Sequence, residues 1–273
     1  MTQRTVFFVS DQTGVTAETM GHSLLTQFGG LAFRQVTLPF ISTVDKAQEA
    51  VRKINSTAST EGIRPIVFST LVQEEMREIV KHANGLFLDF FDAFLGPLER
   101  ELQVKSSRTQ GRAHGMTDLS AYSLRIDATN FALANDDALT RNYDHADVIL
   151  IGVSRSGKTP TCLYMALQYG IFAANYPLAD EEFETGRLPK SLLGYRHKLY
   201  GLTIAPERLQ QIRHERRPDS KYASPPQVAY ELRAAEALFR QNGIPNIDTT
   251  ECSIEEIASR IIEKAGLERR LRP

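Results

Sequence analysis

The sequence has little cysteine, no tryptophan and almost no net charge. Its two cysteines, Cys162 and Cys252, have neither the number nor the spacing of a disulfide framework or a zinc site. The 32 basic and 33 acidic side chains leave a net charge of −1, so no overall positive field attracts nucleic acid or anionic lipid. No apolar run approaches the roughly 20 residues that span a bilayer, and the N-terminus lacks the apolar core of a signal peptide. We therefore expect a cytoplasmic protein with neither a nucleic-acid nor a membrane partner.

Short apolar runs alternate with helical patterns along the first hundred residues. The runs lie at 6–9, 33–40, 64–70 and 85–91, and each is followed by a segment with helical apolar spacing. Such alternation predicts an α/β layer with a parallel sheet. Because 273 residues can form two modest cores, we expect a first α/β domain at residues 1–104.

The remainder of the chain reads as a connection and a second domain. Residues 105–144 combine a polar, glycine-containing stretch with a helical pattern, and we interpret them as a linker and helical connection. The second domain, 145–273, begins with an apolar strand and ends with a helix whose start carries a capping box, Ser253 with Glu256. No internal repeat with a period of tens of residues is visible in the sequence.

Residues 152–159 match the pattern G-x-x-x-x-G-K followed by Ser or Thr at every position. Gly152 and Gly157 allow the backbone to wrap closely around phosphate, and the loop amides with the positive end of the next helix form an anion site. Lys158 supplies charge to the terminal phosphates, and the Thr159 hydroxyl can bind Mg²⁺. The candidate nucleotide-binding residues are therefore Gly152, Val153, Ser154, Arg155, Ser156, Gly157, Lys158 and Thr159.

The context of this motif supports a phosphate-binding loop. A chance match in such a chain is about a one-in-a-hundred event, and this match directly follows an apolar strand and precedes a helical pattern. The predicted fold class is α/β: an N-terminal parallel-sheet α/β domain followed by a P-loop kinase-like α/β domain. The N-K-x-D motif of GTPases is absent, and the later strand at 198–204 ends without an acid. Asp248 is a weak substitute, so metal ligands beyond Thr159 stay open.

Several polar residues outside the motif each allow two interpretations. Asp11 follows the first strand, where α/β sheets place ligands; it could act as a general base or shape a turn. Asp136 and Asp137 could bind Mg²⁺ or end a helix in solvent. Tyr222 could stack on a base or be structural.

The basic side chains and histidines are ambiguous in the same way. Four arginines could form a lid or grip a target, or they could simply be a solvated helix face: Arg208, Arg213, Arg216 and Arg217. The histidines are scattered without metal-ligand spacing, and we expect them to be structural: His22, His82, His114, His145, His197 and His214.

Seven segments in combination resemble a known family. They are VFFVSDQTGVTAE at the start, TLPF at 37–40, RIDATNFALANDD at 125–137, ILIGVSRSGKTPT around the phosphate loop, AANYPL at 173–178, HKLYGLTIAPERL at 197–209 and SKYAS at 220–224. Over nearly the whole chain they resemble the pyruvate, phosphate/water dikinase regulatory protein family. Within this family the likeness is greatest to the branch that regulates phosphoenolpyruvate synthase.

The resemblance implies a bifunctional enzyme. Such proteins phosphorylate a threonine near the catalytic histidine of the synthase with ADP as donor, and they remove that phosphate with inorganic phosphate, releasing pyrophosphate. The implied partner is phosphoenolpyruvate synthase, and a homodimer is one assembly left open. With Mg²⁺ expected as cofactor, we assign Lys158 and Asp11 as candidate catalytic residues.

Two rival functions remain at this stage. A small-metabolite P-loop kinase would use the arginine-rich run as its lid, although such a kinase needs no N-terminal domain. A nucleotide-sensing module without chemistry would use that domain for docking. The motif itself does not distinguish ADP from ATP.

Overall fold

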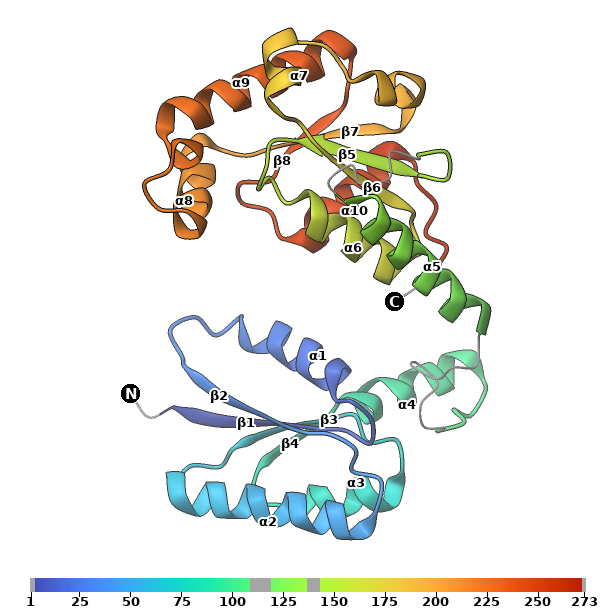
Figure 1. Cartoon of the computed structure of the whole chain (residues 1–273). Helices are drawn as coiled ribbons and strands as arrows, with labels where there is room; N and C mark the ends of the chain where they lie inside the picture. The colour runs from blue at the N-terminus through green and yellow to red at the C-terminus, as the bar shows by residue number, and fades with distance from the viewer. Residues whose placement is uncertain (1–2, 109–118, 137–142, 272–273) are drawn as a thin grey trace. The chain divides into compact units, whose positions relative to one another are not determined.

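The computed structural model describes residues 3–108, 119–136 and 143–271. The chain divides into two compact units, unit 1 (Met1–Thr117) and unit 2 (Asp118–Pro273), each built around its own sheet (Figure 1). Among the described residues, no helix is both long enough and apolar enough to cross a membrane.

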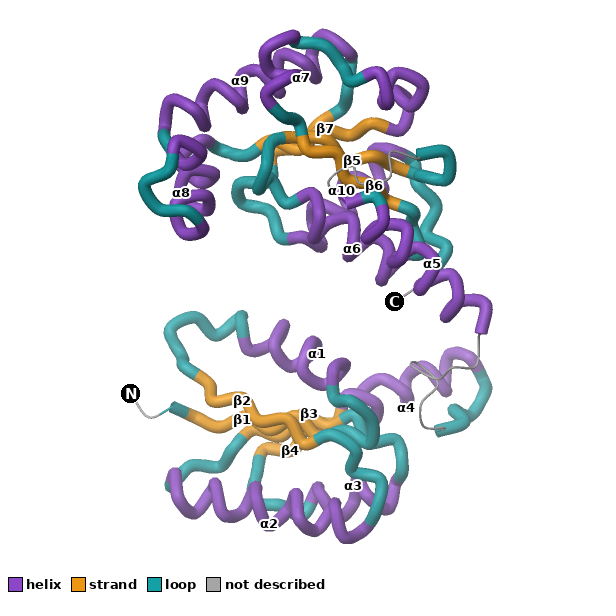
Figure 2. The backbone as a smooth tube through the Cα atoms, viewed as in Figure 1, coloured by secondary structure: helices purple, strands orange, loops and turns teal. Residues whose placement is uncertain are grey.

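Unit 1 is a four-stranded parallel sheet between two pairs of helices (Figure 2). Its strands lie in the order β2-β1-β3-β4, with bounds β1 (Arg4–Val9), β2 (Phe33–Leu38), β3 (Ile66–Ser69) and β4 (Leu86–Asp89). One face is covered by α1 (Val15–Leu25) and α4 (Phe90–Leu102), the other by α2 (Val44–Glu61) and α3 (Glu74–Lys81).

The central strand β1 supplies side chains to both cores of unit 1. Phe7 and Val9 pack with α2 and α3, whereas Val6 and Phe8 face α1 and α4. A strand covered on both faces reads as an unbroken apolar run, which is the pattern that its sequence shows. The Phe8 ring also stacks on Phe68.

Unit 2 is a second four-stranded parallel sheet covered on both faces. Its strands lie in the order β6-β5-β7-β8, with bounds β5 (Val148–Gly152), β6 (Ala173–Pro177), β7 (Leu199–Thr203) and β8 (Asn246–Asp248). One face carries α5 (Leu119–Ala134), α6 (Lys158–Tyr169) and α10 (Ile254–Ala265). The other carries α7 (Asp180–Thr185), α8 (Pro206–Arg216), α9 (Pro225–Asn242) and two 3₁₀ helices, η2 (Lys190–Lys198) and η3 (Lys221–Ala223).

The expected fold class is confirmed, and the two units prove to share one topology. In each sheet the first strand of the unit lies between the second and the third, and the fourth lies outside the third. In each unit the loop after this first strand ends in a left-handed glycine that precedes a helix, Gly14 at φ 89° and Gly157 at φ 91°. The sequence alone shows no such repeat, because strand order leaves no mark on residue identity.

Some element bounds differ from the sequence-based expectation. The apolar run at 85–91 was expected to be one strand, but β4 ends at Asp89 and Phe90 already begins α4. The reason is a cap: the Asp89 side chain accepts a hydrogen bond from the Asp92 N–H. Helix α9 begins at Pro225, earlier than expected, because a proline in the first turn of a helix loses no hydrogen bond. The short helices α7 and η2 were not expected.

Part of the segment that was expected to connect the two domains packs into unit 2. Helix α5, at 119–134, packs along α6, so its contacts place it in unit 2. The residues at 109–118 and 137–142 lie outside those that the structure describes.

Candidate functional site

The segment 152–159 forms a tight loop between β5 and α6. It lies at the carboxyl end of β5, which is flanked by β6 and β7, and this is the position where open α/β sheets bind ligands. Gly152 is required by space, because a Cβ there would lie 2.5 Å from the carbonyl oxygen of Leu202. Arg155 takes a left-handed φ of 76°, which is a costly backbone conformation for a residue with a side chain. The loop is therefore sharply curved.

The interior of this loop offers N–H groups. Within the described residues, no protein acceptor takes up the N–H groups of Ser154, Arg155 and Gly157. Lys158 is buried, and its Nζ donates to the carbonyl oxygen of Val153 at 2.8 Å, so the loop closes around its own ammonium group. Free amides, a helix N-terminus and a cation together form an anion site.

Thr159 lies beside an acidic residue that precedes the loop in the sequence. Its Oγ1 donates to Asp136 Oδ1 at 2.8 Å. The buried Asn175 of β6 donates from Nδ2 to the same carboxylate oxygen at 2.5 Å and to Thr159 Oγ1 at 3.0 Å. A hydroxyl and a carboxylate are hard oxygen donors of the kind that Mg²⁺ prefers, so the residues present fit such an ion.

The alternative acid, Asp248, is occupied elsewhere. At the end of β8 its Oδ1 accepts from the N–H of Thr250 at 2.9 Å and from that residue's hydroxyl. This arrangement is an ordinary Asp-initiated turn. Of the three acids considered for the metal, Asp136 contacts Thr159, Asp248 serves a turn, and Asp137 lies outside the described residues.

Cys162, one turn along α6, is not an available nucleophile. Burial raises the pKa of its thiol, and the nearby Asp136 carboxylate raises this pKa further, against a smaller lowering by Lys158. The thiol therefore stays protonated, and its Sγ donates to the carbonyl oxygen of Ala174.

A buried arginine holds the outer side of the phosphate loop. Arg213 of α8 is fully buried, and its Nη2 donates to Glu231 Oε2 at 2.7 Å and to the carbonyl oxygen of Ser154 at 3.1 Å. Its Nη1 donates to the carbonyl oxygen of Tyr222 at 3.1 Å, and its guanidinium lies 4.1 Å from the centre of the Tyr222 ring. The Tyr222 hydroxyl and Ser154 Oγ are 2.9 Å apart. We call Arg213, Tyr222 and Glu231 the Arg213 cluster.

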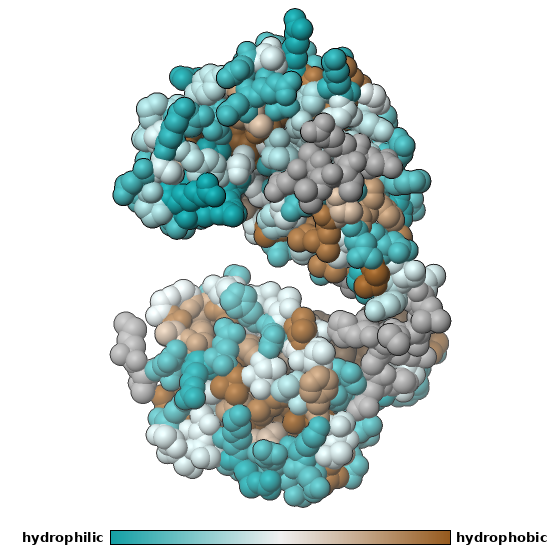
Figure 3. Space-filling view, in the orientation of Figure 1, coloured by the Kyte–Doolittle hydropathy of each residue, from teal (hydrophilic) through white to brown (hydrophobic). Residues whose placement is uncertain are grey.

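This arrangement decides between the interpretations of the arginine run. Arg213 is buried, so it belongs neither to a lid nor to a solvated face, whereas Arg208, Arg216 and Arg217 are exposed. Figure 3 shows a mainly hydrophilic surface around α8. One face of the Tyr222 ring is already covered by Arg213, so that face is closed to a base.

Asp11 lies at the equivalent edge of the sheet of unit 1. It is buried at the end of β1, and its Oδ2 accepts from the N–H of Val72 at 3.3 Å, joining the loops that follow β1 and β3. At the same edge Ser69 donates to the Asp89 carboxylate, whose pKa is raised chiefly by burial. The carboxyl ends of three neighbouring strands thus carry polar groups, of which Asp11 and Ser69 are buried and Asp89 is half-buried.

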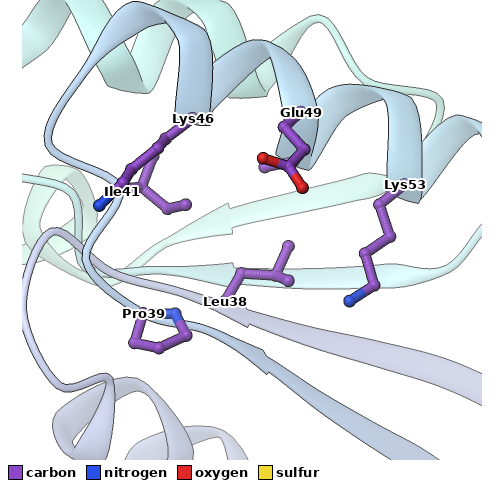
Figure 4. A pocket seen from close by; sticks show the side chains of 7 residues that line it. Leu38, Pro39, Ile41, Lys46, Glu49 and Lys53 are labelled. Atoms are coloured by element: carbon purple, nitrogen blue, oxygen red, sulfur yellow. The ribbon is translucent and has the colours of Figure 1, made fainter.

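A shallow groove of about 210 Å³ lies elsewhere on unit 1, between the end of β2 and α2 (Figure 4). Lys46 and Lys53 stand on either side of Glu49 on the helix, with Leu38 and Pro39 below them. Because a carboxylate separates the two ammonium groups and Lys46 already donates to the carbonyl of Phe40, this groove is not a concentrated anion site.

Sequence reasoning missed Asn175 and Glu231. The available signal for Asn175 was a polar side chain inside the apolar run of β6, because a buried polar group in a strand needs a partner. Glu231 gave no comparable signal, because it lies on a helix with several other charged residues. Within the described residues, no three His, Cys, Asp or Glu side chains are grouped as a metal site would require; His114 lies outside them.

The comparisons with known proteins cover almost the whole chain. The family model described as "Kinase/pyrophosphorylase" matches residues 6–262. The chain is 55% identical over 270 residues to a relative from Alcanivorax borkumensis, covering 98% of this chain and 99% of the relative. It is 54% identical over 270 residues to one from Alkalilimnicola ehrlichii, covering 98% of each chain.

Both relatives are named "Putative phosphoenolpyruvate synthase regulatory protein". A relative from Pseudomonas putida with the same name is 52% identical over 271 residues, 99% of this chain and 100% of its own. The resemblance found from the motifs is confirmed: the chain belongs to the kinase/pyrophosphorylase family.

Proposed function

We propose that this protein regulates phosphoenolpyruvate synthase by phosphorylating one of its threonines with ADP and by removing that phosphate with inorganic phosphate. The observation that carries the proposal is the phosphate loop, in which free amides, the buried Lys158 and the pair of Thr159 and Asp136 lie together. The names of the relatives support the synthase as the target. The small-metabolite kinase and the non-catalytic sensor become outcomes of the test below.

The forward reaction moves the β-phosphoryl group of ADP. The threonine Oγ forms a bond to the β-phosphorus, the bond from that phosphorus to the bridging oxygen breaks, and AMP leaves. Negative charge spreads over the transferred group, and the loop amides and Lys158 Nζ stabilise it. The threonine proton passes to a carboxylate.

In the reverse reaction an oxygen of inorganic phosphate bonds to the phosphorus of the phosphothreonine. The bond to the threonine Oγ breaks, that oxygen takes up a proton, and pyrophosphate leaves. A loop that binds a diphosphate serves both directions, because the transferred group lies between the same donors each time. Mg²⁺ bound by Thr159 and Asp136 would neutralise phosphate charge.

We assign Asp11 as the general base and unit 1 as the part that receives the threonine loop. The loop after β1 has the topological position of the phosphate loop, but it has Val15 directly after its left-handed glycine, where the phosphate loop has Lys158. A loop with a buried carboxylate and no cation suits a hydrogen-bond donor, such as a hydroxyl, rather than a phosphate.

The decisive test uses ADP labelled with ³²P at the β-phosphate, incubated with this protein and the synthase. We expect label on a threonine of the synthase and its release as pyrophosphate when unlabelled phosphate is added. Label on a small molecule instead would support a metabolite kinase, and bound nucleotide without transfer would support a sensor.

In the same assay Asp11→Asn should reduce transfer by about 100-fold or more while ADP binding persists. Normal transfer by this variant would remove Asp11 from the mechanism.

Replacing Asp136 with asparagine should weaken the effect of Mg²⁺ on nucleotide binding. Asparagine keeps an oxygen that can accept from Thr159 and Asn175 but loses the charge that attracts the ion. We expect calorimetry to show that Mg²⁺ tightens ADP binding to the natural protein, and that the variant needs at least about tenfold more Mg²⁺. Asp248→Asn is the matched control, because its carboxylate serves a turn; an equal loss in both variants would refute the assignment.

A further inference from the structure

The outer side of the phosphate loop is tied to three elements that follow it in the sequence. The carbonyl oxygen of Ser154 accepts a hydrogen bond from Arg213 of α8, and its hydroxyl shares a hydrogen bond with the hydroxyl of Tyr222 in η3. Arg213 is in turn fixed by Glu231 of α9, and Gln227 donates to the second oxygen of that carboxylate at 3.0 Å. Ser154, whose position the motif leaves unspecified, thus makes two hydrogen bonds to other elements, as many as Thr159, which the motif specifies.

The bond to the Ser154 carbonyl also sets the direction of the next amide. In a trans peptide the C=O and the following N–H point in opposite directions. With the Ser154 C=O held outwards by Arg213, the Arg155 N–H points away from the Arg213 cluster, and no protein acceptor in the described part of the chain takes it up. Arg155 has the left-handed φ of 76°, so this peptide is the part of the loop that most needs support.

We propose that Arg213 and Tyr222 are positioning residues that hold the Ser154–Arg155 peptide in the orientation that binds a nucleotide's phosphate groups. They act through Ser154 and do not touch the nucleotide themselves. Full burial restricts the Arg213 side chain, and the half-buried Tyr222 ring is held by its contact with the guanidinium and by the hydrogen bond of its hydroxyl to Ser154. The segment SKYAS at 220–224 therefore extends the phosphate loop functionally although it lies more than sixty residues later.

The inference rests on the proposed nucleotide site, so its test measures binding rather than transfer. Tyr222→Phe removes the hydroxyl that meets Ser154 and keeps the ring on Arg213. Ser154→Ala removes the same bond from the other side. We expect each variant to bind ADP about three- to tenfold more weakly by calorimetry, because one hydrogen bond is lost.

The double variant should bind no more weakly than the weaker single variant, since both changes remove one shared bond. Tyr195→Phe is the matched control, because it removes a tyrosine hydroxyl of unit 2 that bonds to Asp144 instead, and its ADP affinity should stay within about twofold of the natural protein. Amide hydrogen exchange of Arg155 and Gly157 should be faster in Tyr222→Phe, with an unchanged unfolding midpoint.

The outcomes separate this proposal from the proposed function. If the natural protein binds ADP and Tyr222→Phe binds it equally well, the positioning role is wrong and the proposed function stands. If the losses of ADP affinity in Tyr222→Phe and Ser154→Ala multiply in the double variant, the positioning role is also wrong. If the natural protein binds neither ADP nor ATP, the proposed function fails, and the phosphate loop has no ligand for which Arg213 could position it.

Discussion

Replacing Lys158 with alanine is expected to lower phosphoryl transfer and phosphorolysis together, each by about 100- to 1,000-fold. The ammonium group is buried and bonded to the Val153 carbonyl, so it is already inside the loop that would enclose the phosphates. In a site that excludes water, one such charge acts on the transferred group without rearrangement. Because both directions pass the same group between the same donors, one substitution affects both rates.

The measurement is the rate of labelling of the synthase and the rate of pyrophosphate release. Lys198→Ala is the control, because that ammonium also donates to a main-chain carbonyl of unit 2, the one of Asp144, at 2.9 Å, but away from the loop. We expect near-normal rates for the control. Near-normal rates for Lys158→Ala in both directions would show that the loop does not carry the chemistry.

The tight loop at 152–159 was predictable from sequence because the motif that marks it is local. The residues of 152–159 are contiguous, and the two glycines, the lysine and the threonine of the motif each stand at the position that the pattern gives them. Gly152 illustrates this: its close approach to Leu202 is the kind of backbone crowding that the glycine position predicts. The strands β1 and β5 were predictable for a similar reason, because a strand that is buried on both faces consists of consecutive apolar residues.

The contact between Asp136 and Thr159 was only half predictable. Asp136 and Asp137 were recognised as alternatives to a missing acidic motif, but a helix ending in two acids is also common in solvent. What decides for Asp136 is its contact with Thr159 and Asn175. That contact depends on α5 packing along α6, and therefore on tertiary structure that a short window of sequence does not contain.

Arg213 shows most clearly where sequence reasoning stops. In the run 206–217 it stands among polar and charged neighbours, and such a run is typical of a solvated helix face. Its polar partners are Glu231 on another helix and the carbonyl oxygens of Ser154 and Tyr222, which lie outside α8. No local pattern distinguishes this arginine from Arg216.

The second large effect concerns the stability of unit 2. Arg213→Met should lower its free energy of unfolding by about 3–5 kcal/mol, because Glu231 is then left as a buried charge without its partner. Adding Glu231→Leu should restore most of this loss, since replacing both members of a buried ion pair by apolar side chains is often neutral for stability. Arg270→Met is the control: its pair with Asp147 is partly exposed, and we expect a loss of no more than about 1 kcal/mol.

The chain itself supplies the probe for this measurement. It has no tryptophan, and all nine tyrosines lie in residues 122–230, so tyrosine fluorescence during urea unfolding reports on unit 2 alone. A loss in Arg213→Met no larger than in Arg270→Met would contradict the argument from burial. A double variant as unstable as the single one would show that the uncompensated carboxylate is not the cause. If the double variant is stable, it still lacks the donor to the Ser154 carbonyl, so weak ADP binding in a well-folded protein would separate what Arg213 does for the fold from what it does for the phosphate loop.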